Sequence, residues 1–460
     1  MRFVSTRGGV PPTDLRTAVL AGPAPDGGLY VPETVPRLTA RELDGLRNLP
    51  FPALSVRVLH HLLGDHAPDF LEEVVHAALD FPLPLIPRET GSGVPEAWIG
   101  ELFHGPTGAF KDVGARFLAH LTAALRHSPD EGLLVLVATS GDTGSAVARA
   151  FGHIPGCRAV VAFPKGRISG VQENQICGAG PGVRPLAVEG SFDDCQRLVR
   201  EVLAAAPHGP PPGSPAHGLH ERVALVSGNS INVGRLLPQA LYYFHFAFQL
   251  PPRWAPPVFA VPSGNLGNLT AGLLARAAGL PTGGFVAATN RNDTVVGFLE
   301  SGTLDETRSS VPTLSSAMDV ALPSNLERAL HLFGGASSSR ARASMAHLVL
   351  ATTHSDEDTL ALMRSVHERT GYLLDPHTAV GLLGLLEART RPLPWEGPGI
   401  VLATAHPAKF APAVREATGI SPTAPASWDQ TSRMVSPLAI PAESLSFQEA
   451  VAQVAREVGG

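Results

Sequence analysis

The sequence predicts an α/β protein with a mostly parallel sheet and helices on both of its faces. Short apolar runs alternate with helical segments over much of the chain, and this βαβα order is typical of parallel strands joined by crossover helices. Runs such as LLVLVA at residues 133–138 are continuously apolar, as expected for strands buried on both sides. Glycine-rich loops join two of these runs to the helices that follow, which places candidate ligand sites at the carboxyl ends of the strands.

The elements follow in order along the chain. Residues 1–90 are predicted to form an irregular start, with a turn into a short extended piece at 27–32 and helical stretches at 40–48 and 51–80 that end before Pro82 and Pro84. Strands are expected at 133–138, 158–163, 223–226, 258–261, 285–289 and 400–404. Helices are expected at 144–151, 191–205, 231–249, 269–278 and 412–418. Proline-rich breaks at 208–215, 251–257, 392–398 and 422–441 are predicted to be surface connections.

Composition argues against several classes of protein. The 460 residues carry a net charge of −6 with 6% aromatic residues and no basic stripe, so nucleic-acid binding is not expected. There is no run of 18 apolar residues and no apolar signal segment, so we expect no membrane span. The odd set of cysteines, Cys157, Cys177 and Cys195, forms no CxxC pair and predicts reduced thiols in a cytoplasmic protein. The histidines show no metal-binding spacing, so no metal is expected.

Lysine is scarce in this chain. Of 35 cationic residues only Lys111, Lys165 and Lys409 are lysines, and the other 32 are arginines. Arginine cannot replace lysine where a neutral amine must attack a carbonyl, because a guanidinium does not lose its proton in proteins. Lys111 follows a glycine- and proline-rich turn that leads into a helix, which favours a chemical role, whereas Lys165 lies in a Pro-Lys-Gly turn and is equally consistent with a surface position.

Two glycine-rich loops lie between a strand and a helix, at 138–145 (ATSGDTGS) and 261–269 (VPSGNLGNL). Free amides and the helix dipole make such a loop a candidate anion site. Either loop alone is also consistent with a tight turn that caps a helix. Neither matches an ATP-binding P-loop or a clean dinucleotide fingerprint.

Two further polar clusters follow strands. The segment SGNSINVGR at 227–235 either caps a helix or holds a second anion, since Ser, Asn and a forked Arg suit a phosphate. The segment LATAHPAKF at 402–410 contains His406, which on its own is more typical of a hydrogen-bonded core histidine than of a catalytic base. An amine with two anion sites points to pyridoxal phosphate chemistry.

Motifs along nearly the whole chain resemble those of the threonine synthase family. They are STRG at 5–8, APDGGLYVP at 24–32, HGPTGAFKD at 104–112, ATSGDTGSA at 138–146, NSINVGR at 229–235, SGNLGN at 263–268, LDPHTAVG at 374–381 and TAHPAKF at 404–410. The resemblance implies the fold-type II architecture of pyridoxal phosphate enzymes, with two open, mostly parallel sheets flanked by helices and an N-terminal segment. We therefore expect an N-terminal helical segment at 1–90, a small α/β domain at 91–225 with Lys111 and the SGDTG loop, and a large α/β domain at 226–460.

The resemblance also implies a reaction and roles for residues. The expected reaction converts O-phospho-L-homoserine and water to L-threonine and phosphate, with pyridoxal 5'-phosphate as cofactor. Lys111 is the expected Schiff-base lysine, and Asp142 and Thr404 are expected at the phenolic oxygen and the ring nitrogen of the cofactor. The cofactor phosphate is expected on backbone amides of Gly264, Asn265, Leu266, Gly267 and Asn268. Expected substrate ligands are Thr139, Ser140 and Thr143, with Ser230, Asn232 and Arg235 at the substrate phosphate.

Two rival interpretations stay open at this point. A phospho-lyase of the same family would eliminate phosphate and release 2-oxobutyrate and ammonia, and a non-catalytic relative would bind pyridoxal phosphate or a metabolite. The expected partner is a small phosphorylated amino acid. The sequence does not decide between a monomer and a homodimer, assigns no role to Lys165, His406 or Lys409, and does not show whether the tail after residue 420 packs.

Overall fold

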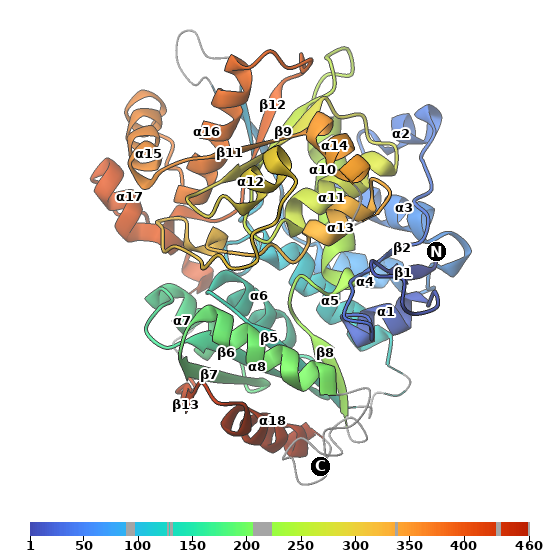
Figure 1. The fold of residues 1–460 in the computed structure, drawn as a ribbon, viewed down its shortest axis with the longest axis vertical. Coiled ribbons are helices and arrows are strands. Elements are labelled where there is room, and N and C mark those ends of the chain that lie inside the picture. The colour runs from blue at the N-terminus through green and yellow to red at the C-terminus, as the bar shows by residue number, and fades with distance from the viewer. Residues whose placement is uncertain are drawn as a thin grey trace.

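The computed structural model describes residues 1–88, 97–126, 128, 132–205, 223–335, 339–428 and 434–458. The chain forms two large sheets with helices around each of them, as Figure 1 shows. A small antiparallel pair, β1 (Phe3–Ser5) with β2 (Tyr30–Pro32), lies apart from both sheets near the N-terminus. The predicted pair of mostly parallel sheets is therefore confirmed.

The first sheet has five strands, all parallel, because helical crossovers join most of its strands. Its order is β13 (Leu438–Pro441), β7 (Val183–Glu189), β6 (Cys157–Pro164), β5 (Gly132–Ala138) and β8 (Val223–Ser227). The side chains of β5 alternate between two apolar clusters. One cluster includes α8 (Phe192–Ala205) and α18 (Ser444–Val458), and the other includes α6 (Asp142–Phe151) and α7 (Gly170–Cys177). Both faces of this sheet are thus covered.

The second sheet has six strands, of which only the edge strand β3 is antiparallel to its neighbour. Its order is β11 (Val349–Thr353), β10 (Gly284–Thr289), β9 (Val258–Pro262), β12 (Gly399–Ala403), β4 (Ala97–Glu101) and β3 (Leu85–Arg88). One face packs on α10 (Val233–Gln249) and α11 (Gly267–Ala277), and the other on α15 (Asp356–Thr370), α16 (Pro376–Thr390) and α17 (Ala411–Thr418). The α5 helix (Lys111–Ala124) contacts both α6 and α10, so it lies between the two sheets.

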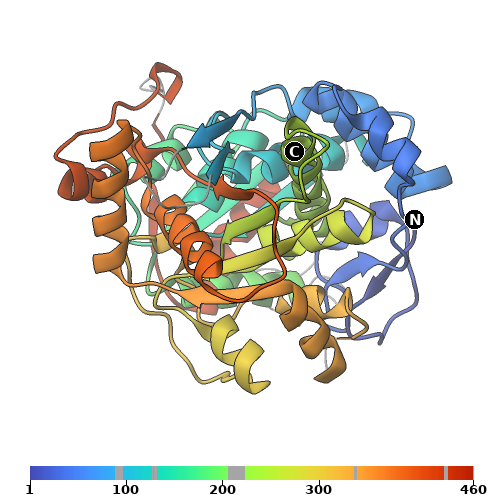
Figure 2. The ribbon, with the colours of Figure 1, turned by 90° about the horizontal axis from the view of Figure 1, so that it is seen from above.

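The remaining helices cover the periphery. They are α1 (Leu15–Ala21), α2 (Ala40–Leu46), α3 (Phe51–Leu63), α4 (Leu71–Ala78), α12 (Thr294–Ser301), α13 (Leu326–His331) and α14 (Ser339–Leu348). Short 3-10 turns occur at η1 (Gly64–His66), η2 (Ser316–Met318), η3 (Pro407–Phe410) and η4 (Ala426–Trp428). Figure 2 and Figure 1 agree that α1 to α4 lie on the opposite flank from α15 and α17.

All six predicted strands are present and β2 lies within the predicted extended piece, but six other strands of the described residues were not anticipated. The apolar run of β7 contains Pro185, and a proline within a run argues against a strand. The β11 strand begins at Val349, directly after the last residue of α14, so no turn residue separates helix from strand. The tail after residue 420 does pack, because β13 pairs with β7 and Phe447 and Val451 of α18 are fully buried.

The three predicted domain ranges remain a prediction. The boundary at 90/91 and the proline-rich break at 208–215 lie outside the described residues. Each sheet draws on distant parts of the chain: β4 pairs with β12 in the six-stranded sheet, and β13 completes the five-stranded one. Within the part of the chain that the structure describes, no helix is long and apolar enough to cross a membrane.

Candidate active site

The loops at the carboxyl ends of β5, β8, β9 and β12 converge on two adjoining cavities. The larger cavity has a volume of about 810 Å³ and the smaller about 50 Å³. Lys111, Ser230 and Asn265 line both of them, so the lysine lies where the cavities meet. Ligand sites at strand ends are the rule in open parallel sheets, and a cavity of this size suits a small molecule.

Lys111 is the first residue of α5, and its side chain is partly buried. Its Nζ lies 4.6 Å from the centroid of the Phe110 ring. Burial, with a smaller contribution from Arg235, lowers the pKa of the Lys111 amine to about 8, although Asp142 opposes the fall. A lysine with such a pKa has an appreciable neutral fraction near pH 7, as a nucleophile or a base requires.

The loop at 263–268 leaves its backbone amides open. Leu266 adopts a left-handed conformation with φ of 56°, which turns the chain so that α11 can begin at Gly267. Within the described part of the chain, no backbone acceptor bonds the amides of residues 264–268. At Gly264 an added Cβ would lie 2.8 Å from the Cα of Met318, so no larger side chain fits without moving the backbone. The loop is therefore a cradle of free donors at a helix N-terminus.

Two buried donors beside this cradle also lack partners. The Nδ2 of Asn268 and the Nε of Arg235 form no hydrogen bond with any described residue, and both residues line the small cavity. Asn268 is held in place because the hydroxyls of Tyr242 and Tyr243 donate to its Oδ1 at 2.6 and 2.7 Å. Buried polar groups are almost always satisfied, so unpaired donors here indicate a missing anion. The cradle, the Nδ2 of Asn268 and the amine of Lys111 together fit the phosphate and aldehyde of pyridoxal phosphate.

The loop at 139–145 is arranged differently. The Oγ1 of Thr139 accepts hydrogen bonds from the amides of Gly141 and Gly144, at 2.9 and 2.8 Å, so this loop satisfies two of its amides with its own side chain. Gly141 has a φ of 134°, and an added Cβ there would lie 2.2 Å from Cδ of Gln172. Thr139, Ser140 and Thr143 line the large cavity, whereas Asp142 lines the small one.

Asp142 is almost fully buried at the start of α6. Its Oδ1 accepts from Gln172 at 2.9 Å and forms an ion pair with Lys409 at 2.8 Å. Burial would raise the pKa of this carboxyl, but Lys409, Gln172 and His377 outweigh it and lower the pKa overall. Asp142 is therefore a carboxylate at neutral pH.

The cluster at 229–235 separates into members with different surroundings. Ser230 lines both cavities, and its Oγ accepts from the Nδ2 of Asn265 at 2.8 Å. The pKa of the Arg235 guanidinium is lowered by burial to about 10, with Asp112 opposing the fall, and the residue lines the small cavity. Asn232 lines neither cavity: it caps α10 through Gly234, and its Nδ2 donates to the carbonyls of Val19 and Ser227.

The strand end at 403–410 is locked to the loop before Lys111. The amide of Phe110 donates to the carbonyl of Thr404 at 2.9 Å, and the amide of His406 donates to Gly108. Thr404 lines the small cavity. His406 lines neither cavity, and its Nδ1 accepts from the amide of Ala408 at 3.1 Å. This is the hydrogen-bonded histidine that the sequence favoured over a catalytic base.

The other two lysines differ sharply in environment. Lys165 is exposed on the surface and pairs with Glu189 at 2.8 Å. Lys409 is fully buried, between Asp142 and the carbonyl of Thr107.

Sequence reasoning missed several residues that hold this site together. His377 lines the small cavity, and its Nε2 accepts from the amide of Ala317, so its Nδ1 carries the hydrogen that it donates to Asp375 at 2.8 Å. Arg328 is fully buried and donates to the carbonyls of Tyr30, Ser230 and Ile231. The motif LDPHTAVG contains His377 and Asp375, but no motif in the sequence points to Arg328.

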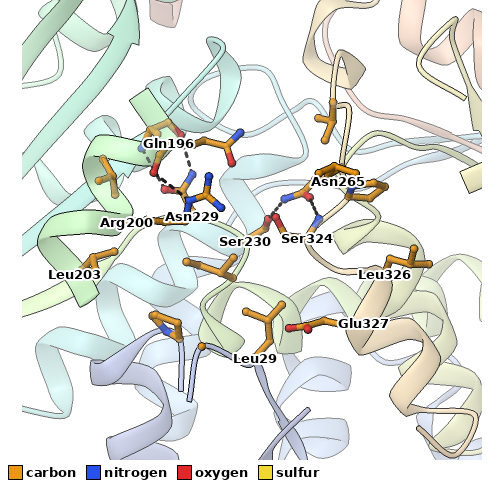
Figure 3. Close-up of a pocket in the computed structure, with 18 of the residues that line it drawn as sticks. Leu29, Gln196, Arg200, Leu203, Asn229, Ser230, Asn265, Ser324, Leu326 and Glu327 are labelled. Carbon is orange, nitrogen blue, oxygen red and sulfur yellow. Dashed lines mark hydrogen bonds between the residues drawn. The ribbon is translucent and has the colours of Figure 1, made fainter. Parts of the chain in front are cut away.

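The large cavity is bounded by both halves of the molecule. Figure 3 shows Gln196 and Arg200 of α8 on one side, Asn265 and Ser324 on the other, and Ser230 between them. Among the described residues that line it, Arg7, Lys111 and Arg200 are cationic and Glu327 is the one acid. Such a balance favours an anionic substrate.

Three family models match successive parts of the chain. They are described as threonine synthase N terminus at residues 2–79, pyridoxal-phosphate dependent enzyme at 80–402, and threonine synthase C-terminal at 378–437. Threonine synthase of Escherichia coli is 40% identical over 404 residues, which is 87% of each chain. That of Pseudomonas aeruginosa is 36% identical, over 93% of this chain and 92% of the relative.

The chain belongs to the threonine synthase family.

Solved structures agree with this assignment. The crystal structure of threonine synthase from Escherichia coli matches with a TM-score of 0.86 at 34% identity and covers 98% of this chain and 100% of its own. The structure of threonine synthase from Brucella melitensis with pyridoxal phosphate bound matches with a TM-score of 0.87 at 34% identity, covering 99% and 100%. As a threonine synthase family member the chain is a pyridoxal phosphate enzyme, in agreement with the open cradle beside Lys111.

Proposed function

We propose that this enzyme converts O-phospho-L-homoserine and water to L-threonine and inorganic phosphate, with pyridoxal phosphate as its cofactor. The observation that carries the proposal is the position of Lys111, between a cradle of unpaired amides and a larger cavity lined by cationic side chains. A phosphorylated amino acid needs a second anion site beyond that for the cofactor. The cations of the large cavity, with Ser230 and Arg235 beside it, supply that charge.

Residues of the small cavity would hold the cofactor. The amides of Gly264 to Asn268 would bind its phosphate, Thr404 would lie at the ring nitrogen, and Asp142 would lie near the phenolic oxygen. The chemistry that pyridoxal phosphate supplies when bound is a carbonyl for amines and a ring that delocalises the electron pair of a broken C–H bond.

The protein's own groups would then move protons and hold the substrate. Once free, the neutral amine of Lys111 takes the proton from Cα and returns protons later, for which its lowered pKa suits it. Thr139, Ser140 and Thr143 face the large cavity and would bind the substrate carboxylate. Ser230 and Arg235 would bind the phosphate that leaves. Asn232 would fix the 229–235 segment in place, because it caps the N-terminus of α10.

The test is product analysis on purified enzyme given O-phosphohomoserine. We expect threonine and phosphate in equal amounts, whereas 2-oxobutyrate would replace the proposal with the phospho-lyase reaction. In the Lys111→Ala variant we expect turnover to fall on the order of 10³-fold or more, because the base is lost. Borohydride trapping followed by peptide mapping should place the label on residue 111; a label elsewhere would contradict this site.

We also propose a cytoplasmic location, which the free thiols support. Cys157, Cys177 and Cys195 are buried and unpaired, and burial raises the thiol pKa to about 12, 11 and 12 respectively. Such thiols are unreactive and suit a reducing compartment.

Sedimentation analysis distinguishes a monomer from a homodimer, the two assemblies considered for this chain.

A further inference from the structure

Lys409 is a fully buried cation for which the proposed reaction has no use. Its Nζ forms an ion pair with Oδ1 of Asp142 at 2.8 Å and donates to the carbonyl of Thr107 at 2.9 Å. The two partners belong to different elements: Asp142 begins α6 after β5, and Thr107 belongs to the loop before α5. Lys409 itself lies after β12, so it connects that segment to the loop before α5 and to the loop after β5.

The contact with Thr107 reaches the catalytic lysine in two steps. The amide and hydroxyl of Thr107 both donate to the carboxylate of Asp112, at 2.9 and 2.7 Å. Asp112 is the neighbour of Lys111 at the start of α5 and is fully buried. Gln175 donates to the same Thr107 carbonyl at 3.1 Å, so this turn is fixed from two sides.

The contact with Asp142 leaves one carboxylate oxygen available. Both Lys409 and Gln172 bond Oδ1, and no bond from a described residue to Oδ2 is observed, while Asp142 lines the small cavity. Lys409 and Gln172 therefore fix the orientation of the carboxylate without covering it. The titratable groups around the pair are Lys111 and Asp112 of α5, His377 of α16, and His406, which precedes η3.

We propose that Lys409 is a positioning residue that holds Asp142 as an oriented carboxylate beside Lys111. Its importance for turnover rests on the proposed function, but the pair itself is a property of the folded chain. Without the Lys409 cation, Asp142 is a buried carboxyl whose main remaining partner is neutral, and burial favours the protonated form. Asp142 then exchanges a proton in the range where the enzyme works.

The first test is a pH titration of the absorbance spectrum of the holoenzyme. The Lys409→Met variant should show one step more than the wild type, with a midpoint between about pH 5 and 8. The double variant Lys409→Met/Asp142→Asn should lose that step, since it has no carboxyl to titrate. An unchanged titration in Lys409→Met, or an extra step that persists in the double variant, would overturn the proposal.

The second test needs neither cofactor nor substrate. Unfolding temperatures of the cofactor-free wild type, the two single variants and the double variant form a cycle, in which the double variant should be more stable than either single one. In the wild type the lowered pKa of Asp142 gives stability that is lost as pH falls. In Lys409→Met the pKa of Asp142 should be raised, and a raised carboxyl pKa gives stability that is lost as pH rises. The difference in unfolding temperature between this variant and the wild type should therefore widen from pH 4 to pH 8. If the effects of the two single substitutions on the unfolding temperature simply add in the double variant, and the difference between Lys409→Met and the wild type does not change with pH, Lys409 and Asp142 are not coupled.

Lys165 provides the matched control. Its ion pair with Glu189 has the same length, 2.8 Å, but both side chains are about half exposed, at 54% and 55%. Lys165→Met should leave the titration, the unfolding temperature and turnover near wild type, since exposed pairs contribute little. In Lys409→Met, kcat/KM should fall on the order of 10²-fold, mainly in kcat, because the reacting groups are misplaced. If no variant makes threonine but the extra step appears, the proposed function fails and the role of Lys409 in holding Asp142 stands.

Discussion

The two glycine-rich loops follow parallel strands and precede helices, yet they do different work. In the loop at 139–145 the hydroxyl of Thr139 accepts from the amides of Gly141 and Gly144, so two amides of this loop are satisfied within it. In the loop at 263–268 Leu266 adopts a left-handed conformation, and no described backbone acceptor bonds the amides of residues 264–268. A glycine-rich turn therefore offers to an anion only those amides that none of its own side chains already satisfies.

The largest effect that separates the loops is expected at Gly264. In Gly264→Ala the new Cβ meets the backbone of Met318 at 2.8 Å, so the cradle must move. We expect pyridoxal phosphate to bind about 100-fold more weakly, the upper end for a forced contact. A fluorescence titration with the cofactor measures this. Gly297→Ala, where nothing lies within 4 Å, is the control and should bind normally.

Thr139→Val tests the loop at 139–145. Two buried amides would lose their acceptor, so the free energy of unfolding should fall by about 2 kcal/mol, roughly thirtyfold in the unfolding constant. A urea titration should show a lower midpoint with an unchanged slope. Thr139→Ser keeps the hydroxyl and should restore most of the loss; equal stability in the Val and Ser variants would show that the amides do not depend on this side chain.

Asn265 fixes the open loop to its surroundings. Its side chain donates to Ser230 and accepts from the amide of Ser324, and both bonds are drawn in Figure 3. Asn265→Ala should weaken cofactor binding about tenfold, since a less rigid cradle must be ordered on binding. Calorimetric titration with pyridoxal phosphate gives the affinity. An unchanged dissociation constant would mean that the backbone alone sets the shape of the cradle.

The smallest effect concerns Lys111, which lies between the loops. With a pKa of about 8, its amine in the cofactor-free protein should react with an acylating reagent about fivefold faster at pH 8 than at pH 7, because only the neutral form reacts. Mass mapping of residue 111 measures the rate. Asp142 in the first loop raises this pKa, so Asp142→Asn should move the midpoint below 8; an upward shift would contradict the assignment.

Local patterns predicted the part of this site that local structure builds. Strand ends, helix starts and the glycine loops follow from apolar runs and turn residues, and Lys111 and the 263–268 loop line one cavity. The expectation for Thr404, which lines the same cavity, came from the family resemblance. The partners of Asp142 could not be foreseen, because Lys409 and Gln172 reach it from other parts of the chain. Asn232 shows the reverse: the motif suggested a ligand, but its side chain is used by a helix cap and two carbonyls.

The route of the chain through its two sheets affects how the protein is made. The β4 strand pairs with β3 but joins the rest of its sheet only through β12, and the five-stranded sheet gains its edge strand only with β13. A polypeptide still emerging from the ribosome therefore lacks an edge in one sheet and an interior strand in the other. Pairings between distant segments form slowly and expose strand edges meanwhile. We expect fragments that lack β12 or β13 not to bind pyridoxal phosphate. The amine of Lys111 then meets the reactive aldehyde only after both sheets have formed.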